Sequence, residues 1–298
     1  MHPRAEADRL RLVVGCGYLG TRVARLWTAA GSRVIATTRH AARAPELQSL
    51  GAIPAVVDVT AADSGWDRLF AGQGTPGTVL WCVSVDPRSG RSHRDVHVEG
   101  LRHLLDALGV ARGAGTPPRV IFTSSTGVWG DEGGGIVDEA TPTNPSREAG
   151  RALVEAEALL AAHAAGPGTV LRLAGIYGPG RLPRLDDLRA GRPIAADPDS
   201  WLNLIHVDDA AMVVTAVAAA PAPGPRYVVS DGHPVRRRAW YGRLAALTGS
   251  PEPRFDAAAP RSRAADKRVD PSRLFREIGP TLTHPDALAA LESLVTPD

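Results

Sequence analysis

Residues 10–20 read LRLVVGCGYLG, an apolar run of five residues followed by a glycine pattern and then by a helical pattern that reaches Trp27. The apolar run predicts a buried strand, and Gly15 permits the tight turn that leaves it. Gly17 lets backbone N–H groups approach a pyrophosphate, and Gly20 lets the helix pack closely on the strand. The helix start attracts an anion through its unpaired amides and its dipole. The segment therefore predicts a dinucleotide-binding turn.

Length, charge and cysteine usage narrow the class of protein. The chain has 298 residues and a formal net charge of +2, so no strongly basic field indicates nucleic acid or a membrane surface as a partner. Cys16 and Cys82 show no metal-ligand spacing and indicate reduced thiols rather than a disulfide framework. Residues 1–9 lack the apolar segment of a secretory signal, and the apolar stretch 210–220 is too short to span a bilayer. We therefore expect a cytoplasmic globular protein without a metal site.

Strand-like runs and helical patterns alternate along the first half, as a parallel sheet with crossover helices requires. The predicted strands are 10–14, 33–36, 53–57, 79–83, 119–123, 169–173 and 226–229. The predicted helices include 93–108, 146–163, one from about Asp208 and one around 239–247. This pattern predicts an α/β fold, a Rossmann-type doubly wound parallel sheet with a smaller C-terminal substrate-binding lobe.

The pattern changes after residue 173. Residues 178–198 are rich in glycine, proline and arginine, which indicates loops that face a substrate. We therefore predict a dinucleotide-binding domain over residues 1–173. Residues 174–298 are predicted to form mainly the substrate-binding lobe, with segments near 201–230 returning to the Rossmann core.

Four further motifs follow the glycine pattern. They are DVT at 58–60, TSSTGVWG at 123–130, RLAGIYGPG at 172–180 and NLIHVDDA at 203–210. With these motifs in family order, the chain resembles the extended short-chain dehydrogenase/reductase superfamily, specifically its atypical epimerase/dehydratase-like members with a G-C-G-Y-L-G start. The resemblance covers nearly the whole chain and implies a pyridine nucleotide coenzyme, although a fold does not fix the reaction. In the last motif, His206 and Asp208 would stabilise a loop-to-helix junction, with Asp208 as the N-cap.

The family's usual catalytic pair, Tyr-x-x-x-Lys at the start of a long helix, is missing from this chain. Lys267 is the sole lysine and Arg263 lies four positions before it, so the motif occurs nowhere. In a gapless comparison with a typical member, Ala149 replaces the tyrosine and Leu153 replaces the lysine. In the family, the phenol moves a proton to or from the substrate oxygen, while the ammonium lowers the phenol pKa and holds the ribose. The proton path of this chain would therefore be nonstandard.

The hydroxyl half of the family's catalytic apparatus is present. Ser125 matches the hydroxyl that hydrogen-bonds the reacting carbonyl, and Thr126 adjoins it; the alternative is a strand end that satisfies its own backbone. A proton donor is still needed, and the candidates are Tyr177, Glu148 and His97. Each also has a structural alternative: Tyr177 would pack under the glycine turn, Glu148 would cap a helix, and His97 would be a core residue. The predicted catalytic residues are Ser125, Thr126 and Tyr177.

Residues 37–39, after the second strand, indicate which coenzyme is bound. An NAD site usually has an acid near this position that binds the ribose 2′-hydroxyl. Here Thr37, Thr38 and Arg39 offer hydroxyls and a guanidinium, which suit a 2′-phosphate; the alternative is an exposed arginine without a ligand. We therefore predict NADP, with NAD as the alternative. Including positions implied by the resemblance, the predicted coenzyme-binding residues are Gly15, Cys16, Gly17, Tyr18, Leu19, Gly20, Thr38, Arg39, Asp58, Val59, Cys82, Val83 and Ser84.

Three functions fit these observations. We favour an NADP-dependent oxidoreductase acting on a small carbonyl or sugar-like substrate. A nucleotide-sugar epimerase or dehydratase is the first alternative, and a catalytically silent NADP(H)-binding sensor or scaffold is the second. The first alternative has some support from a cluster of arginines that would bind a diphosphate or form a solvated surface: Arg181, Arg184, Arg189 and Arg192. Arg147 and Arg151, one helical turn apart, would bind ribose or phosphate or form a solvated helix face. The family resemblance also implies a homodimer.

Overall fold

The computed structural model describes residues 10–165, 168–256 and 265–295. Residues 1–9, for which the sequence predicts no secretory signal, lie outside the described residues. Among the helices of the described part, none has the length and apolar character needed to cross a membrane.

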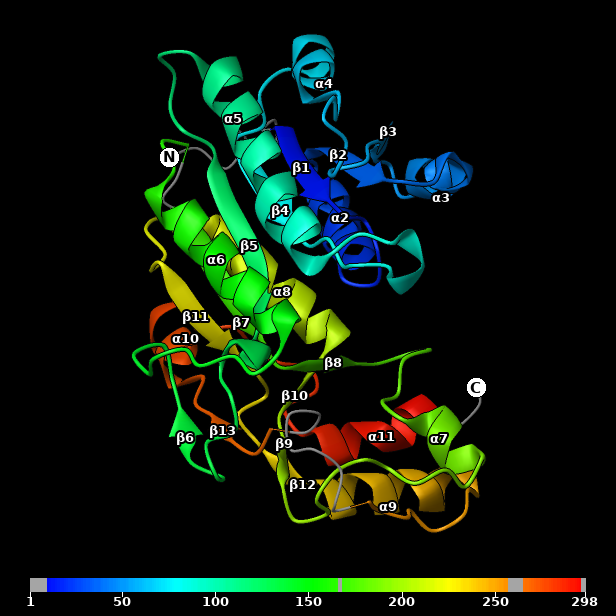
Figure 1. Cartoon of the computed structure of the whole chain (residues 1–298). Coiled ribbons are helices and arrows are strands. Elements are labelled where there is room, and N and C mark those ends of the chain that lie inside the picture. The colour runs from blue at the N-terminus through cyan, green and yellow to red at the C-terminus, as the bar shows by residue number, and fades with distance from the viewer. Residues whose placement is uncertain (1–9, 166–167, 257–264, 296–298) are drawn as a thin grey trace. The chain divides into compact units, whose positions relative to one another are not determined.

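Seven strands form the central sheet, in the order β11-β7-β5-β4-β1-β2-β3 (Figure 1). Strands β1 to β5 pair in parallel, with Leu12 of β1 opposite Ile35 of β2 and Val79 of β4. The order reverses between β1 and β4, which defines the switch point where ligands bind in doubly wound folds. The strands are β1 (Leu10–Val14), β2 (Arg33–Thr38), β3 (Ile53–Val56), β4 (Thr78–Trp81), β5 (Arg119–Ser125), β7 (Thr169–Leu173) and β11 (Arg226–Val229).

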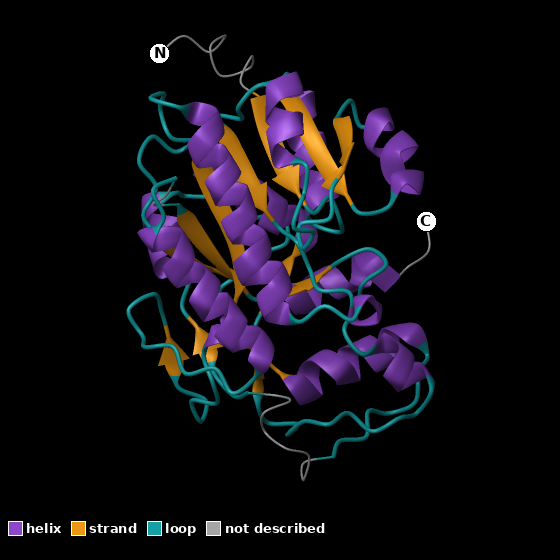
Figure 2. Cartoon of the chain, turned by 45° about the horizontal axis from the view of Figure 1, so that its top comes forward, coloured by secondary structure: helices purple, strands orange, loops and turns teal. Residues whose placement is uncertain are grey.

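Helices cover both faces of this sheet, α5 and α6 on one face and α2 and α8 on the other (Figures 1 and 2). Helix α5 shows why: its leucines 101, 104, 105 and 108 recur at helical spacing and are all fully buried. The prediction of a Rossmann-type α/β fold is therefore confirmed. The helices of this region are α2 (Gly20–Ala29), α3 (Ala44–Ser49), α4 (Trp66–Gln73), α5 (Gly100–Arg112), α6 (Glu148–Ala162) and α8 (Val207–Ala219).

Several predicted boundaries differ from the observed ones. The expected helix 93–108 is a short π-helical turn, Asp95–Glu99, that continues into α5. Strand β5 extends to Ser125, whereas β4 ends at Trp81 rather than at residue 83. The helix predicted from Ser146 begins at Glu148, and such differences of one or two residues are usual at element ends.

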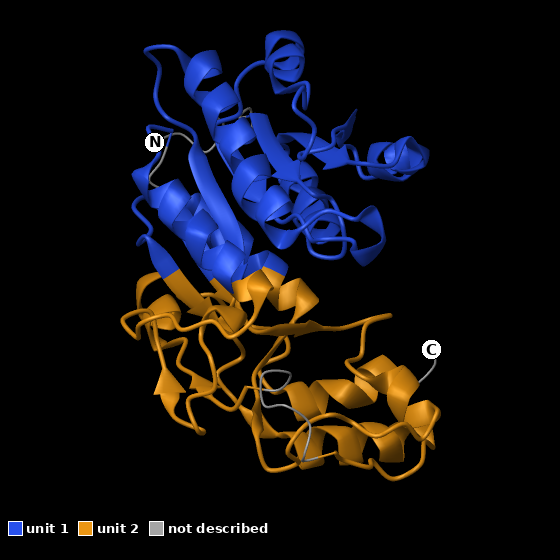
Figure 3. Cartoon of the chain, in the orientation of Figure 1, with its two compact units in different colours: residues 1–124, 151–171, 211–226 blue, residues 125–150, 172–210, 227–298 orange. Residues whose placement is uncertain are grey.

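The chain divides into two compact units, each made of separate segments (Figure 3). Unit 1 comprises residues 1–124, 151–171 and 211–226, and unit 2 comprises residues 125–150, 172–210 and 227–298. The sequence predicts a boundary at residue 173, with segments near 201–230 returning to the Rossmann core, and in the structure residues 211–226 group with unit 1. Segment 125–150 groups with unit 2 because β6 (Ile136–Val137) pairs with the distant strand β13 (Arg268–Val269).

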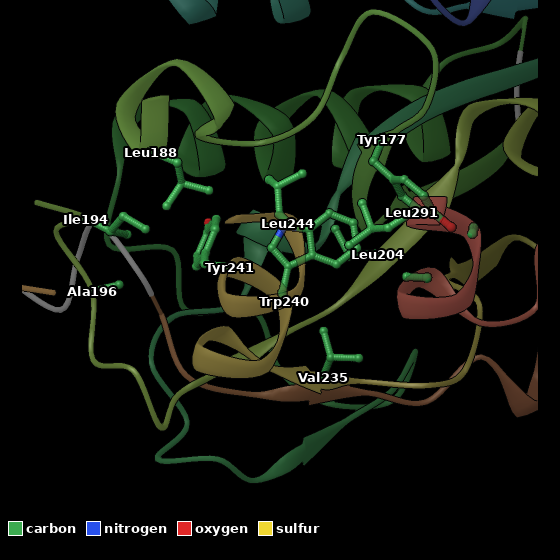
Figure 4. Close-up of a cluster of buried hydrophobic side chains, with 12 residues drawn as sticks. Tyr177, Leu188, Ile194, Ala196, Leu204, Val235, Trp240, Tyr241, Leu244 and Leu291 are labelled. Atoms are coloured by element: carbon green, nitrogen blue, oxygen red, sulfur yellow. The ribbon is translucent and has the colours of Figure 1, made fainter. Parts of the chain in front are cut away.

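Unit 2 has its own apolar core (Figure 4). Trp240 and Leu244 of α9 are fully buried there, together with Leu204, Tyr177 and Leu291. The elements that carry this core or border it are β8 (Gly175–Tyr177), α7 (Leu185–Arg189), β9 (Trp201–Leu202), β10 (Leu204–His206), β12 (Val235–Arg236), α9 (Arg237–Thr248) and α11 (Ala287–Val295). Helix α10 (Ser272–Glu277) also belongs to unit 2. Strand β8 pairs with β10, and β9 pairs with β12, so backbone pairing connects the loops between the helices.

Candidate functional site

The turn after β1 needs glycine at two positions. Gly15 has a φ of +86°, and a Cβ placed there would lie 2.8 Å from the Val83 Cα. A Cβ on Gly20 would lie 2.6 Å from the Gly15 carbonyl oxygen. Thr37 fixes the turn, since its hydroxyl accepts a hydrogen bond from the Gly15 N–H at 3.0 Å. The glycines therefore let the turn, the strand ends and helix α2 approach one another closely.

Gly17 has a different role in the same turn. It is exposed, and a Cβ there would meet only the Gly15 carbonyl oxygen, at 4.0 Å. Helix α2 follows with no side-chain cap hydrogen bond and no acid in its first turn. Open space over Gly17 beside an uncapped positive helix end fits the pyrophosphate of a dinucleotide.

A cavity of about 150 Å³ lies beside this turn, within unit 1. Nine of the predicted coenzyme-binding residues line it: Gly15, Cys16, Gly17, Thr38, Arg39, Val59, Cys82, Val83 and Ser84. Thr37, His40, Arg43 and Val57 complete the wall. The cavity therefore joins the ends of β1, β2, β3 and β4, as the switch point requires.

Four predicted coenzyme residues do not line this cavity. Leu19 is buried and Gly20 supports the turn, while the Tyr18 ring lies 4.4 Å from the Arg22 guanidinium carbon. Asp58 is exposed, and its carboxylate accepts hydrogen bonds from the Thr60 N–H at 2.9 Å and hydroxyl at 2.7 Å. Burial opposes ionisation of Asp58, but the Thr60 hydrogen bonds together with the charges of Arg91 and Arg39 lower the Asp58 pKa. The coenzyme contacts of these four residues stay predictions.

Two arginines, Arg39 and Arg43, line the cavity at the glycine turn. Arg39, predicted to meet a 2′-phosphate, donates to Asp86 at 3.1 Å. Arg43, which sequence reasoning missed, donates to the Cys16 carbonyl at 2.7 Å and forms an ion pair with Glu46 at 2.8 Å. Arg43 ends a 3-10 turn, Ala41–Arg43, that carries no periodic pattern. Both guanidinium groups are held by acids of their own.

Ser125 and Thr126 lie at the end of β5 in a second cavity, of about 270 Å³, whose whole wall belongs to unit 2. The Ser125 hydroxyl oxygen accepts a hydrogen bond from the Gly127 N–H at 3.0 Å. This contact is the one expected if Ser125 satisfies the backbone at the strand end. It uses the hydroxyl oxygen only as an acceptor. The hydroxyl proton is still able to reach a ligand in the cavity.

Helix α6 begins close to this cavity, at the position where the family has its tyrosine and lysine. Gly150 packs tightly there, since a Cβ on it would lie 2.5 Å from the Gly127 carbonyl oxygen. Leu153 is buried and carries no charge. Gly150 and Leu153 at the start of this helix therefore contribute packing and no titratable group.

Lys267 lines the same cavity from β13's N-terminal side, and sequence reasoning did not count it as a site residue. The side chain is buried, and its ammonium donates to the carbonyl oxygens of Trp129 and Gly130, both at 3.2 Å. Burial lowers the Lys267 pKa to about 8, and Asp131 and Glu132 oppose this shift in part. The cavity thus contains an ammonium group that titrates close to neutral pH.

The three predicted proton-donor candidates lie in different settings. Tyr177 is fully buried, with its ring centroid 5.2 Å from that of His206 and 5.4 Å from that of Trp240 (Figure 4). Burial raises the Tyr177 pKa, which favours its packing alternative. His97 is also buried, and burial lowers its pKa to about 4. Glu148 is exposed in the first turn of α6. A catalytic role for Tyr177 stays a prediction.

The arginine-rich loop after residue 180 is partly neutralised. Arg184 and Arg192 both pair with Asp187, at 3.0 Å and 2.8 Å. These ion pairs favour a solvated, acid-balanced surface over a cluster dedicated to a diphosphate.

His206, Asp209 and His284 form a group whose ligand-type atoms lie within 4.8 Å of one another. Both carboxylate oxygens of Asp209 accept backbone N–H groups, from Thr283 at 2.7 Å and from His284 at 2.9 Å. The two imidazole rings stack at 3.7 Å with an angle of 28° between their planes. Nearly parallel rings direct their lone pairs alongside one another, so this group is arranged for packing rather than for sharing one metal ion.

The fold and the glycine turn define a Rossmann-type nucleotide-binding protein. A model of the NAD dependent epimerase/dehydratase family matches residues 11–230. Protein YeeZ of Escherichia coli strain K12 is 33% identical over 287 residues, which cover 93% of this chain and 96% of YeeZ. The chain belongs to the NAD-dependent epimerase/dehydratase family, which confirms the resemblance to extended short-chain dehydrogenases.

Solved structures share the fold of this chain. A functionally unknown conserved protein from Silicibacter pomeroyi has a TM-score of 0.76 and 30% identity, and the match covers 96% of this chain and 98% of that one. WbmG of Bordetella bronchiseptica, solved with NAD and UDP, has a TM-score of 0.78 at 20% identity, with 96% and 94% covered. The likeness to WbmG shows the shared fold alone.

Proposed function

We propose that this protein is an NADP-dependent oxidoreductase that acts on a small carbonyl or sugar-like substrate. The observation that carries the proposal is the cavity at the glycine turn, which places Thr38, Arg39 and Arg43 where an NAD site would have an acid. Membership of an NAD-dependent family supports a pyridine nucleotide there. The cytoplasmic location and the homodimer expected from the sequence remain part of this proposal.

Within this proposal, each part of the chain has a defined task. The glycine turn and the start of α2 hold the pyrophosphate, and the arginines at the end of β2 and in the following turn receive the 2′-phosphate. A bound reduced nicotinamide would supply a hydride to the carbonyl carbon. Ser125 donates a hydrogen bond to the carbonyl oxygen and so stabilises the negative charge that develops there. The alcohol product then needs one proton on that oxygen, which the missing phenol cannot provide.

A nucleotide-sugar epimerase or dehydratase is the second candidate. The solved WbmG complex with NAD and UDP favours it, because the two chains share the fold. The loss of Tyr-x-x-x-Lys and the acid-paired arginines of the 180–192 loop weigh against it. Turnover of UDP-sugars in the absence of any carbonyl substrate would select this candidate, and NADPH binding without turnover of either class would select the silent sensor.

The coenzyme preference gives the first test. In a fluorescence titration at fixed ionic strength, we expect NADPH to bind more tightly than NADH. Arg43→Ala and Arg39→Ala should each weaken NADPH by about tenfold or more, because each removes a charge-assisted hydrogen bond to the 2′-phosphate.

NADH affinity in the same variants is the internal control, since Arg43 also holds the Cys16 carbonyl. Arg68→Ala is the matched surface control, because Arg68 is exposed, pairs with Asp63 and does not line the cavity. Tighter binding of NADH than of NADPH by the unmodified protein would reject the NADP assignment.

A further inference from the structure

The charged side chains that line the cavity containing Ser125 are all positive among the described residues. Its wall includes the side chains of Arg147, Arg237 and Lys267, and no aspartate or glutamate is among the described residues that line it. Three polar side chains, Ser146, Asn203 and Thr126, complete the hydrogen-bonding surface. A small cavity lined by three cations and no acid is suited to an anion rather than to a neutral molecule.

Lys267 is held firmly in this wall. Asn203 donates to the Lys267 carbonyl at 2.8 Å and accepts from the Val269 N–H at 2.9 Å, so it fixes the backbone on both sides of the lysine. The Arg268 N–H bonds the Gly135 carbonyl at 2.8 Å, which ties the same segment to β6. The lysine is therefore positioned by contacts with residues far away in the sequence.

The ammonium of Lys267 has room for a ligand. Within residues 10–165, 168–256 and 265–295, its hydrogen-bond partners are the carbonyl oxygens of Trp129 and Gly130. An ammonium has three N–H donors, so these two contacts leave one for a ligand. The acids that favour its charged form, Glu132 and Asp131, do not line the cavity, so the charge that faces the cavity is positive.

We propose that this cavity binds a small oxyanion, a carboxylate or a phosphate group, through Lys267, Arg147 and Arg237. The volume of about 270 Å³ is enough for a small acid. The inference rests on the proposed function in one respect: if Ser125 binds the reacting carbonyl, the substrate is a carbonyl compound that carries an acid group. Anion binding itself does not require the coenzyme.

The site has a defined pH dependence. The groups that act on Lys267 are Asp131 and Glu132, which favour its charged form, and Arg147 and Arg237, which disfavour it. The ammonium is present below a pKa of about 8 and is lost above it. Affinity for an anion is therefore highest near neutral pH and falls as the pH rises from 7 to 9.

The test is isothermal titration calorimetry on the full chain without coenzyme, with malonate, inorganic phosphate and the neutral malonamide as probes. Malonate or phosphate should bind at pH 7, and malonamide should not; the stronger of the two anions identifies the acid group. Lys267→Met should weaken that anion by about tenfold or more, because it removes a charged donor. Lys267→Arg should retain binding and abolish the decrease between pH 7 and pH 9, since arginine does not titrate there.

Arg237→Gln should weaken the anion in the same way, whereas Arg238→Gln is the matched control. Arg238 adjoins Arg237 but is exposed, pairs with Asp199 and does not line the cavity. Thermal unfolding of each variant separates folding from binding, and anion affinity is measured only on folded protein. Equal anion affinity in Lys267→Met and the unmodified protein, or no anion binding at all, overturns the proposal.

Failure of the oxyanion proposal can be distinguished from failure of the proposed oxidoreductase function. Absence of NADPH binding with intact anion binding would contradict the oxidoreductase and leave the oxyanion site standing. Intact NADPH binding without anion binding would contradict the oxyanion site alone.

Discussion

Replacing Gly15 by alanine is expected to abolish measurable coenzyme binding and to lower the free energy of unfolding by about 2–4 kcal/mol. The residue has a φ of +86°, a conformation that alanine adopts only with strain. The added Cβ would also lie 2.8 Å from the Val83 Cα and 2.9 Å from the Val83 nitrogen, both backbone atoms that cannot rotate away. The turn must therefore shift at the place where the pyrophosphate would lie, which should weaken NADPH by about 100-fold or more.

Gly109→Ala is the matched control for this substitution. Gly109 lies in α5, lacks a positive φ, and a Cβ there would meet nothing within 4 Å. The same chemical change should therefore leave coenzyme affinity unaltered and stabilise the protein by up to about 1 kcal/mol through helix propensity. Urea unfolding and fluorescence titration measure both effects. A Gly15→Ala variant that binds NADPH as tightly as Gly109→Ala would show that the turn is not the coenzyme site.

The sequence predicts the Rossmann core well because its signals are local. The observed strands Leu10–Val14, Thr169–Leu173 and Arg226–Val229 have the predicted bounds. Each is an apolar run beside turn residues, buried by helices whose apolar spacing is equally visible in the sequence. The glycine turn is predictable for the same reason, since its three glycines lie within six residues of one another.

The second cavity is less predictable because its parts come from distant segments. Lys267 contacts Trp129 and Gly130, which lie 138 and 137 positions away. The residue that positions it, Asn203, belongs to a motif in which the sequence draws attention to His206 and Asp208. In the sequence, no spacing rule connects Lys267 to Ser125.

The coenzyme cavity shows a similar limit on a smaller scale. The position of Arg39 after β2 predicts a coenzyme contact, and this residue does line the cavity. Its ion pair with Asp86 crosses 47 positions and depends on where the loop after β4 runs. Sequence reasoning misses Arg43 because the segment Ala41–Arg43 is a short 3-10 turn without a periodic pattern.

Asp209→Ala is expected to destabilise the protein by about 3 kcal/mol, the second largest effect among these predictions. The sequence draws attention to its neighbour Asp208 as an N-cap, but Asp209 is the buried acid, with no exposed surface. Its carboxylate accepts the backbone N–H groups of Thr283 and His284 at 2.7 Å and 2.9 Å. Removal leaves both N–H groups without their acceptor and frees the segment that leads into α11.

Two further variants test this account by equilibrium unfolding in urea. Asp208→Ala removes an exposed acid one residue away and should cost less than about 1 kcal/mol. Asp209→Asn keeps one carbonyl acceptor but loses the charge, so its cost should lie between those of the two alanine variants. Coenzyme affinity, which depends on unit 1, should be unchanged in folded Asp209→Asn. If Asp209→Ala is no less stable than Asp208→Ala, the carboxylate does not hold the 283–284 backbone.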